Sequence, residues 1–136
     1  MSAEQNIATV KDIYEAFGRG DVEAILEQCT DDVDWAVDSA VEIAPWHGVK
    51  RGKAEVPRFF AGIAQAGPVT EFTPLGFAGN DDEVMVFLRY AFTANETGTH
   101  VSMHLHHYWR FRDGKVAYFR GSEDTALIAS ALGREV

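Results

Sequence analysis

Apolar residues recur at helical spacing in three segments of the first half of the chain. The first segment begins behind a capping-box pattern at Ser2 and ends at Gly20. A shorter helix is expected after Asp21, which suits an N-cap position. A third helix is expected to begin at Gly52, with Pro57 tolerated only within its first turn.

Alternation with a period of two predicts the strands. A short strand is predicted at residues 33–37, where Val33, Trp35 and Val37 share one face. Four longer strands are predicted near residues 69–78, 83–94, 99–112 and 115–123. The dipeptide Asp113-Gly114 between the last two is a strong two-residue hairpin signal.

These elements predict one α+β domain that spans residues 1–136. Strands of this length must bend, so we expect a curved, mainly antiparallel sheet with a mixed edge. It would wrap as a cone around the three N-terminal helices, and residues 125–132 would form a short closing helix. The concave apolar space is the default binding site. The long connection over residues 39–52 is expected at its mouth, where a lid could sit.

The charge of the chain argues against several classes of binding partner. The 136 residues carry 12 Lys and Arg against 21 Asp and Glu, a formal charge of −9. All of the excess acid lies before residue 43, and we interpret it as a soluble outer face that disfavours anionic ligands at the cavity mouth. Nucleic acid and anionic membranes are poor partners for such a chain. No signal peptide or membrane-spanning run is apparent, and the lone Cys29, placed in a predicted helix tail, fits the reducing cytoplasm.

Four segments of the sequence resemble a known family: IYEAFGRGDVEAILEQCTDDVDW, HGVKRGKAEVPRFF, YWRFRDGKVAYF and DTALIASALG. In these four segments the chain resembles the SnoaL-like and ketosteroid-isomerase-like branch of the nuclear-transport-factor-2-like (NTF2-like) superfamily. The resemblance implies a cone-shaped α+β fold, a cavity for a small molecule, no cofactor, and a homodimer formed through the outer sheet face. It leaves the activity open, because this fold hosts several kinds of enzyme as well as binding modules without catalysis.

The catalytic residues of ketosteroid isomerases are mostly absent from the matching positions. By resemblance, their Asp general base falls on Val37, with Asp38 beside it. Their helix Tyr falls on Ile13, with Tyr14 one position on, and their neutral Asp falls on His107.

One catalytic position of the SnoaL-like polyketide cyclases does match. Their Asp acid/base lies near the start of the closing helix, and Asp124 stands there. The same position makes Asp124 a helix N-cap, and the two roles are compatible.

His107 lies on the apolar face of its predicted strand and points into the core or the cavity. It is either a buried, hydrogen-bonded side chain or a general acid/base oriented by a carboxylate. The two-residue turn pairs position 107 with 120, whereas the resemblance turns Phe119, Gly121 and Glu123 toward the cavity. A bulge in the last strand would reconcile the two and bring Glu123 or Asp124 near His107.

The predicted site combines these groups with aromatic walls. Asp124 would be the acid/base, His107 would orient it or share its proton, and Tyr14 would donate to a developing oxyanion. The predicted ligand-binding residues are Phe17, Trp35, Asp38, Trp46, His47, Phe59, Phe60, Tyr90, Trp109, Phe119 and Glu123. Asp38 also suits a solvated acidic face.

A run of histidines on the opposite strand face needs its own explanation. His100, His104 and His106 share that face, and such pairs can chelate zinc. No carboxylate or cysteine with clear ligand spacing joins them, so we predict no metal site and favour a polar dimer interface. Zinc hydrolysis stays a third possibility.

The leading hypothesis is a cofactor-independent enzyme of the isomerase or cyclase type. It would transfer a proton on a neutral, hydrophobic cyclic or carbonyl compound. The alternative is a non-catalytic module that binds a hydrophobic ligand or serves for dimerisation.

Overall fold

A computed structural model describes residues 2–40 and 42–135 of the chain. Helices and strands follow one another in an α+β order. They are α1 (Ala3–Arg19), α2 (Val22–Glu27), β1 (Cys29–Val37), β2 (Lys50–Arg51), α3 (Gly52–Ala66), β3 (Val69–Gly79), β4 (Glu83–Thr93), β5 (His100–Arg112), β6 (Lys115–Ser122) and α4 (Thr125–Ala131). The predicted fold class is confirmed.

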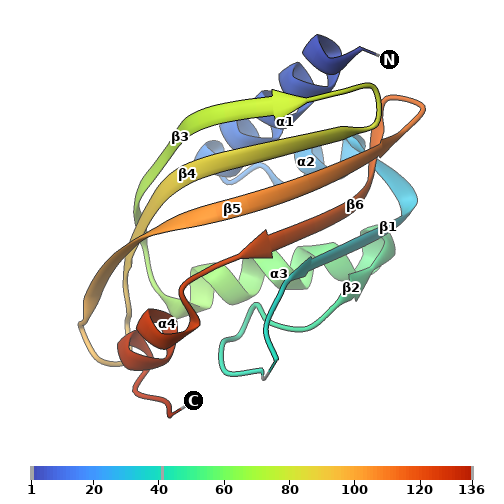
Figure 1. The fold of residues 1–136 in the computed structure, drawn as a ribbon. Coiled ribbons are helices and arrows are strands. Elements are labelled where there is room, and N and C mark those ends of the chain that lie inside the picture. Colours follow the sequence, from blue (N-terminus) through green and yellow to red (C-terminus); the bar gives the residue numbers. More distant parts are fainter. Residues whose placement is uncertain (1, 41, 136) are drawn as a thin grey trace.

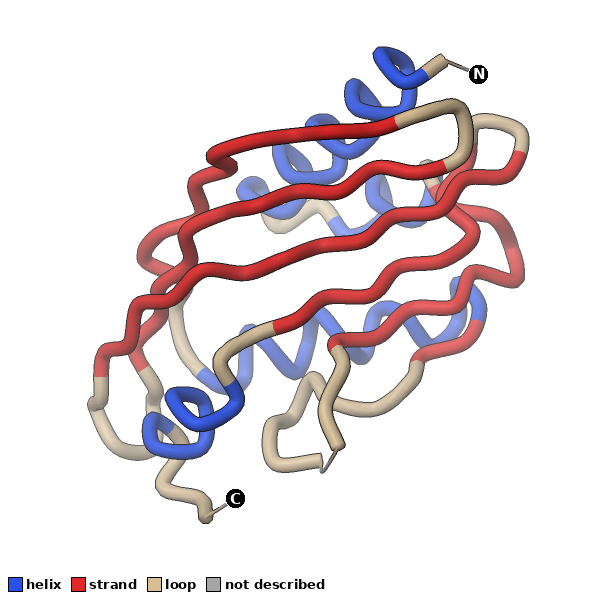
Figure 2. Tube along the Cα trace, in the orientation of Figure 1, coloured by secondary structure: helices blue, strands red, loops and turns tan. Residues whose placement is uncertain are grey.

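The strands form one curved sheet in the order β2-β1-β6-β5-β4-β3. β3 to β6 are antiparallel neighbours, while β1 runs parallel to β6 and antiparallel to β2. The edge strands β2 and β3 do not pair with each other, so the sheet stays open. Helices α1, α2 and α3 cover one face, and α4 lies at the end of the sheet where β6 finishes (Figures 1 and 2).

The capping residues place the helices as the sequence predicts. Ser2 and Gln5 form the capping box of α1, and Gly20 ends that helix in the left-handed conformation. Asn6 is buried on α1 and donates to the carbonyl oxygens of Asn80 and Asp81. These bonds tie the first turn of α1 to the β3–β4 hairpin.

Two local predictions are wrong. Cys29 is not in a helix tail: α2 ends two residues earlier, and Cys29 opens β1 opposite Val116. Tertiary pairing with β6 therefore overrides the local pattern and lengthens the strand. Burial raises the pKa of the Cys29 thiol to about 12, so it packs as a small apolar residue. Pro57 lies beyond the first turn of α3, where it removes one backbone hydrogen bond.

The last hairpin contains the bulge that the resemblance requires. Arg112 pairs with Lys115 and Phe111 with Val116, but Arg110 pairs with Tyr118, so Ala117 is the extra residue. Beyond the bulge, Trp109 lies opposite Phe119 and His107 opposite Gly121. One face of β6 thus turns Phe119, Gly121 and Glu123 toward the helices.

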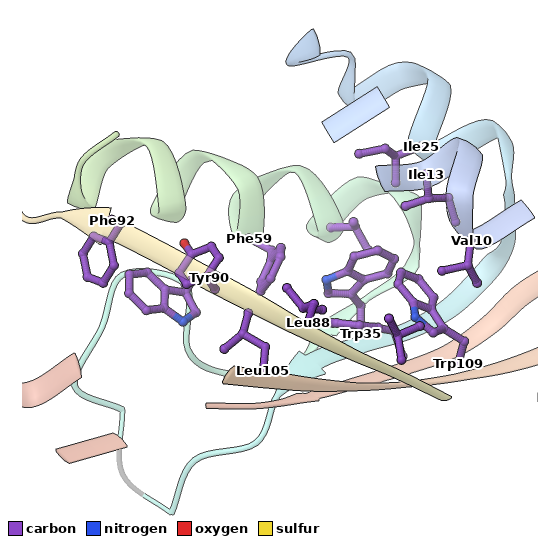
Figure 3. Packing of buried hydrophobic residues seen from close by; sticks show 14 of the residues in the cluster. Val10, Ile13, Ile25, Trp35, Phe59, Leu88, Tyr90, Phe92, Leu105 and Trp109 are labelled. Carbon is purple, nitrogen blue, oxygen red and sulfur yellow. The ribbon is translucent and has the colours of Figure 1, made fainter. Parts of the chain in front are cut away.

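The core fills the space between the sheet and the helices. Figure 3 shows Trp35, Phe59, Tyr90, Leu105 and Trp109 pointing into this layer from β1, α3, β4 and β5. In the described part of the chain, no helix is long and apolar enough to cross a membrane.

Candidate functional site

A small cavity lies within the aromatic layer between the sheet and the helices. Its volume is about 60 Å³. It is lined by Ile13, Tyr14, Phe17, Trp35, Val37, Trp46, Phe59, Phe60, Ile63, Phe72, Tyr90, Leu105, His107, Trp109, Phe119 and Glu123. No Lys or Arg is among these described residues, and Glu123 is their one carboxylate. The cavity therefore favours a neutral, apolar ligand with few polar groups.

Glu123 is held by the loop between β1 and β2. Its Oε1 lies 2.6 Å from His47 Nε2 and 3.3 Å from Trp46 Nε1. The side chain of His47 is fully buried and that of Glu123 is 5% exposed. A carboxylate so deep in an apolar site needs such donors, because the desolvation of an unpaired charge is costly.

The backbone of the same loop sets the tautomer of His47. The N–H groups of Ile43 and Ala44 lie 3.1 and 3.3 Å from His47 Nδ1 and donate to it. With Nδ1 an acceptor, the ring is neutral and its proton is on Nε2, which donates to Glu123. Both groups facing Oε1 are thus donors, while Oε2 hydrogen-bonds to none of the described residues. The free oxygen is the one that can take a proton from a ligand.

A second polar group, centred on Tyr14, projects from α1. Trp109 Nε1, which can only donate, lies 3.4 Å from the Tyr14 hydroxyl oxygen. The hydroxyl lies 2.7 Å from His107 Nδ1, its one acceptor among the described residues, so Tyr14 donates to Nδ1.

Burial determines the charge of this pair. Desolvation, and then the nearby charge of His106, lowers the pKa of His107 from 6.5 to about 3. Burial also raises the pKa of Tyr14, with a smaller opposing effect of the Trp109 hydrogen bond. Both side chains are therefore neutral near pH 7, and His107 bears its proton on Nε2.

Tyr90 is the remaining ionisable side chain of the lining. Burial, and then the charge of Glu123, raises its pKa, so it too stays protonated. Its hydroxyl is therefore a hydrogen-bond donor in the wall of the cavity.

An open groove runs past the cavity between α1, α3 and the start of β3. Its volume is about 1030 Å³, and it shares Tyr14, Phe17, Phe60, Ile63 and Phe72 with the cavity wall. The cavity is smaller than the roughly 150 Å³ that holds benzene in an engineered protein core. A cyclic ligand therefore requires these shared side chains to rotate, which would join the cavity to the groove.

Most of the predicted site residues meet at this cavity. Tyr14 and His107 line it, as do Phe17, Trp35, Trp46, Phe59, Phe60, Tyr90, Trp109, Phe119 and Glu123. His47 is buried beside Glu123, so this part of the segment expected to form a lid packs against the core. His107 and Glu123 line the same cavity but have separate hydrogen-bond partners.

Two predicted carboxylates lie outside the cavity, which corrects their expected placement. Asp124 is exposed, and its Oδ1 accepts from the backbone N–H of Leu127, 3.1 Å away, so it caps α4. The side chain of Asp38 is 68% exposed and lies 3.7 Å from Arg120 Nε. Both follow the inward-facing position at the end of their strands, and the alternation along a strand turns them away from the cavity.

Five lining residues were not predicted as ligand contacts: Ile13, Val37, Ile63, Phe72 and Leu105. Leu105 shares a strand face with His107, so strand parity alone would have identified it. Phe72 lies on β3 beside two shifts of register with β4, and its direction cannot be read from local alternation.

Comparison with known protein families identifies the family of the chain. The SnoaL-like domain family matches residues 10–119. The chain belongs to this family. No curated protein matches it.

Solved structures agree with this assignment. The SnoaL-like chain is 26% identical to an NTF2-like protein of unknown function from Burkholderia pseudomallei, with a TM-score of 0.86 over 94% of this chain and 97% of that one. It is also 26% identical to TerC, co-crystallised with polyporic acid, with a TM-score of 0.85 over 95% and 98%. A proposed SnoaL-like polyketide cyclase from Jannaschia sp. CCS1 is 17% identical and shares the fold, with a TM-score of 0.83 over 98% and 95%.

The NTF2-like cone fold expected from the sequence is thus confirmed for this SnoaL-like protein. The family binds small molecules, and the aromatic cavity is the place in this chain that suits one.

Proposed function

We propose that this SnoaL-like protein is a cofactor-independent enzyme of the isomerase or cyclase type. It would move a proton on a neutral, hydrophobic cyclic compound that bears a carbonyl group. The observation that carries the proposal is Glu123, a carboxylate in an apolar cavity that is fixed through Oε1 and whose Oε2 has no hydrogen bond to the part of the chain that the structure describes.

Glu123 replaces Asp124 as the proposed base. Oε2 would take a proton from the carbon next to the ligand's carbonyl, so that a C–H bond breaks and an O–H bond forms on the carboxylate. His47 and Trp46 would fix the carboxylate orientation, which is a large part of general base catalysis. The proton would then return to another atom of the ligand, leaving the enzyme unchanged.

Tyr14 is proposed as the donor to the developing oxyanion. A hydroxyl has one proton, so Tyr14 can serve either His107 or a ligand, but not both. If His107 moves its single proton from Nε2 to Nδ1, it becomes a donor to the Tyr14 oxygen, and the Tyr14 proton is released for the ligand. His107 is therefore proposed to position this proton rather than to act as the base.

One similar structure supports a small-molecule ligand. TerC, 26% identical over nearly the whole chain, was co-crystallised with polyporic acid, a small organic molecule. In this chain, four ionisable side chains line one aromatic cavity, more than a site for apolar binding alone requires. This observation favours catalysis over the non-catalytic alternative.

Two neighbouring carboxylates allow a matched test of the base. Substitution Glu123→Gln keeps an acceptor for His47 and Trp46 but removes the basic oxygen. We expect it to lower turnover of a ligand identified by native mass spectrometry roughly 100-fold or more. Asp124→Asn keeps a good helix cap, so its turnover should stay near that of the wild type. A larger loss in Asp124→Asn than in Glu123→Gln would restore Asp124 as the base and refute the proposal.

We also propose a homodimer through the outer sheet face. Met85 and Phe87 on β4 are exposed apolar residues of this face, and the ring of Phe87 stacks on His104 at 4.6 Å. Exposed apolar groups on the outer face of a sheet favour association with a second copy. Light scattering should give twice the chain mass for the wild type and the monomer mass for Phe87→Arg. A wild-type monomer at micromolar concentration would contradict this proposal.

A further inference from the structure

The three tryptophans of the chain all line the cavity, but their indole N–H groups are used differently. Trp46 donates to Glu123, and Trp109 donates to Tyr14. The Nε1 of Trp35 is buried and hydrogen-bonds to none of the residues that the structure describes. One indole N–H in the cavity wall is therefore left without a partner.

The surroundings of Trp35 explain why the protein itself cannot satisfy this group. The residue is 2% exposed, and its ring is packed against four other aromatic rings. The ring centroids of Phe59, Phe60, Trp109 and Phe119 lie 5.8, 5.6, 5.5 and 4.5 Å away. In Figure 3 the Trp35 nitrogen lies on the side of the ring that faces the interior toward Phe59.

An unpaired buried N–H is a real cost to the free protein, because the group loses its bond to water on folding and gains none. If Trp35 served packing alone, a phenylalanine would fill much of the space without that penalty. A ligand that enters the cavity with an oxygen acceptor would remove the penalty on binding, and a pure hydrocarbon would not.

We infer that Trp35 Nε1 is the recognition point for a carbonyl oxygen of the ligand, and that it sets the specificity of the cavity for ketones over hydrocarbons of the same shape. This inference names the substrate class of the proposed function and rests on it for the choice of cavity. A site that uses a hydrogen-bonding group for recognition rejects analogues that lack the partner.

A matched pair of ligands tests the inference. The probes are 2-tetralone and tetralin, which share a fused ring system and differ by the carbonyl oxygen. We expect wild-type protein to bind 2-tetralone about threefold to tenfold more tightly than tetralin, the value of one neutral hydrogen bond. Trp35→Phe should bring this ratio close to one. Phe59→Leu, which alters the same wall without touching the N–H, should weaken both ligands and keep the ratio.

A spectroscopic measurement reports on the bond itself. In a ¹⁵N-labelled protein the indole N–H signal that Trp35→Phe removes should move on addition of 2-tetralone and move less with tetralin. A ketone that binds no better than the hydrocarbon, or not at all, overturns the inference. So does a Trp35→Phe variant that keeps the wild-type preference.

The role of Trp35 and the proposed catalysis can be refuted separately. Glu123→Gln should keep the ketone preference while losing proton transfer. A preserved preference with no proton transfer in any variant would refute the proposed function and leave the role of Trp35 standing. If the protein transfers a proton but its ketone preference does not depend on Trp35, the proposed function stands and the role of Trp35 is refuted.

Discussion

Single hydrogen-bond choices determine what each polar residue of the cavity can do. His47 is neutral and donates to Glu123 because two backbone N–H groups occupy its other nitrogen. Tyr14 is committed to His107 because Trp109 can only donate. These assignments make Glu123 the one charged group of the lining, and they leave the indole N–H of Trp35 for a ligand to satisfy.

The neutral state of His107 has a consequence for stability. Its pKa is about 3 in the folded protein against 6.5 for an ordinary histidine. Between these values the unfolded chain binds a proton that the folded protein does not, so stability rises with pH. This contribution is complete above about pH 6.5 and is lost progressively as the pH falls toward 3, by up to about 1.4 kcal/mol per pH unit.

Substitution His107→Gln removes the titrating group and keeps an acceptor for Tyr14. We expect the wild-type free energy of unfolding to fall more steeply than that of the variant as the pH is lowered from about 7 to 4.5. Urea unfolding at a series of pH values measures both curves. Parallel curves would show that His107 is not held neutral by its surroundings.

The bulge in β6 determines which residues reach the site. If Ala117 took a regular place in the ladder opposite Arg110, the tight Asp113-Gly114 turn would pair Trp109 with Tyr118 and turn Glu123 away from the cavity. The same strand would then present its solvent-facing side chains to the core. The bulge thus connects a local irregularity to the position of the proposed base.

Deletion of Ala117 tests this connection. Deletion removes the extra residue, so Tyr118 follows Val116 directly and the pairs Arg110–Tyr118 and Trp109–Phe119 are kept. We therefore expect a loss of no more than about 2 kcal/mol in the free energy of unfolding. Insertion of a second alanine after Ala117 instead moves every following side chain of the strand to the opposite face, and we expect it to cost more than about 4 kcal/mol. Insertion of one alanine after Gly98, in the exposed β4–β5 turn, serves as the control and should cost far less. A deletion variant that is destabilised as much as the variant with an alanine inserted after Ala117 would contradict the observed register.

Local sequence signals predicted where helices and strands lie better than they predicted the contacts between these elements. Capping at Ser2 and Asp21 and alternation along β3 to β6 placed most of the elements within a few residues. The start of β1 at Cys29 was missed because it depends on pairing with Val116, more than eighty residues away. Such pairing leaves no trace in the periodicity of a short acidic segment.

Site residues could be predicted where alternation along a strand sets the direction of their side chains. They could not be predicted where the path of a loop sets it. Trp109 and His107 follow from alternation on β5, and Trp35 from alternation on β1. Glu123 was grouped with the ligand contacts through family resemblance, but its bond to His47 depends on the path of the β1–β2 loop. No periodic signal describes that path, so the proposed base was sought in Asp124 instead.

At the scale of the whole molecule, the acidic excess and the cavity are separate. The acids of β1 face outward, where Asp32 pairs with Arg112, and Asp34 with Arg51 and Arg120. These exposed or partly exposed pairs contribute little to stability. The interior keeps one carboxylate, Glu123, in an aromatic shell, and the wide groove beside it lies next to rotatable aromatic side chains. The acidic excess thus lies on the surface, while the proposed base, Glu123, lies in the neutral, sheet-rich part of the chain.

The central claim, that Glu123 moves a proton on a bound ketone, can be measured before the natural substrate is known. The acidic C–H groups of 2-tetralone exchange with D₂O, and NMR follows the loss of their proton signal. We expect the wild type to accelerate this exchange above the buffer rate, and Glu123→Gln to lower the enzyme's contribution at least about 100-fold. Equal exchange rates in the wild type and Glu123→Gln, or no acceleration by the wild type, would contradict the account.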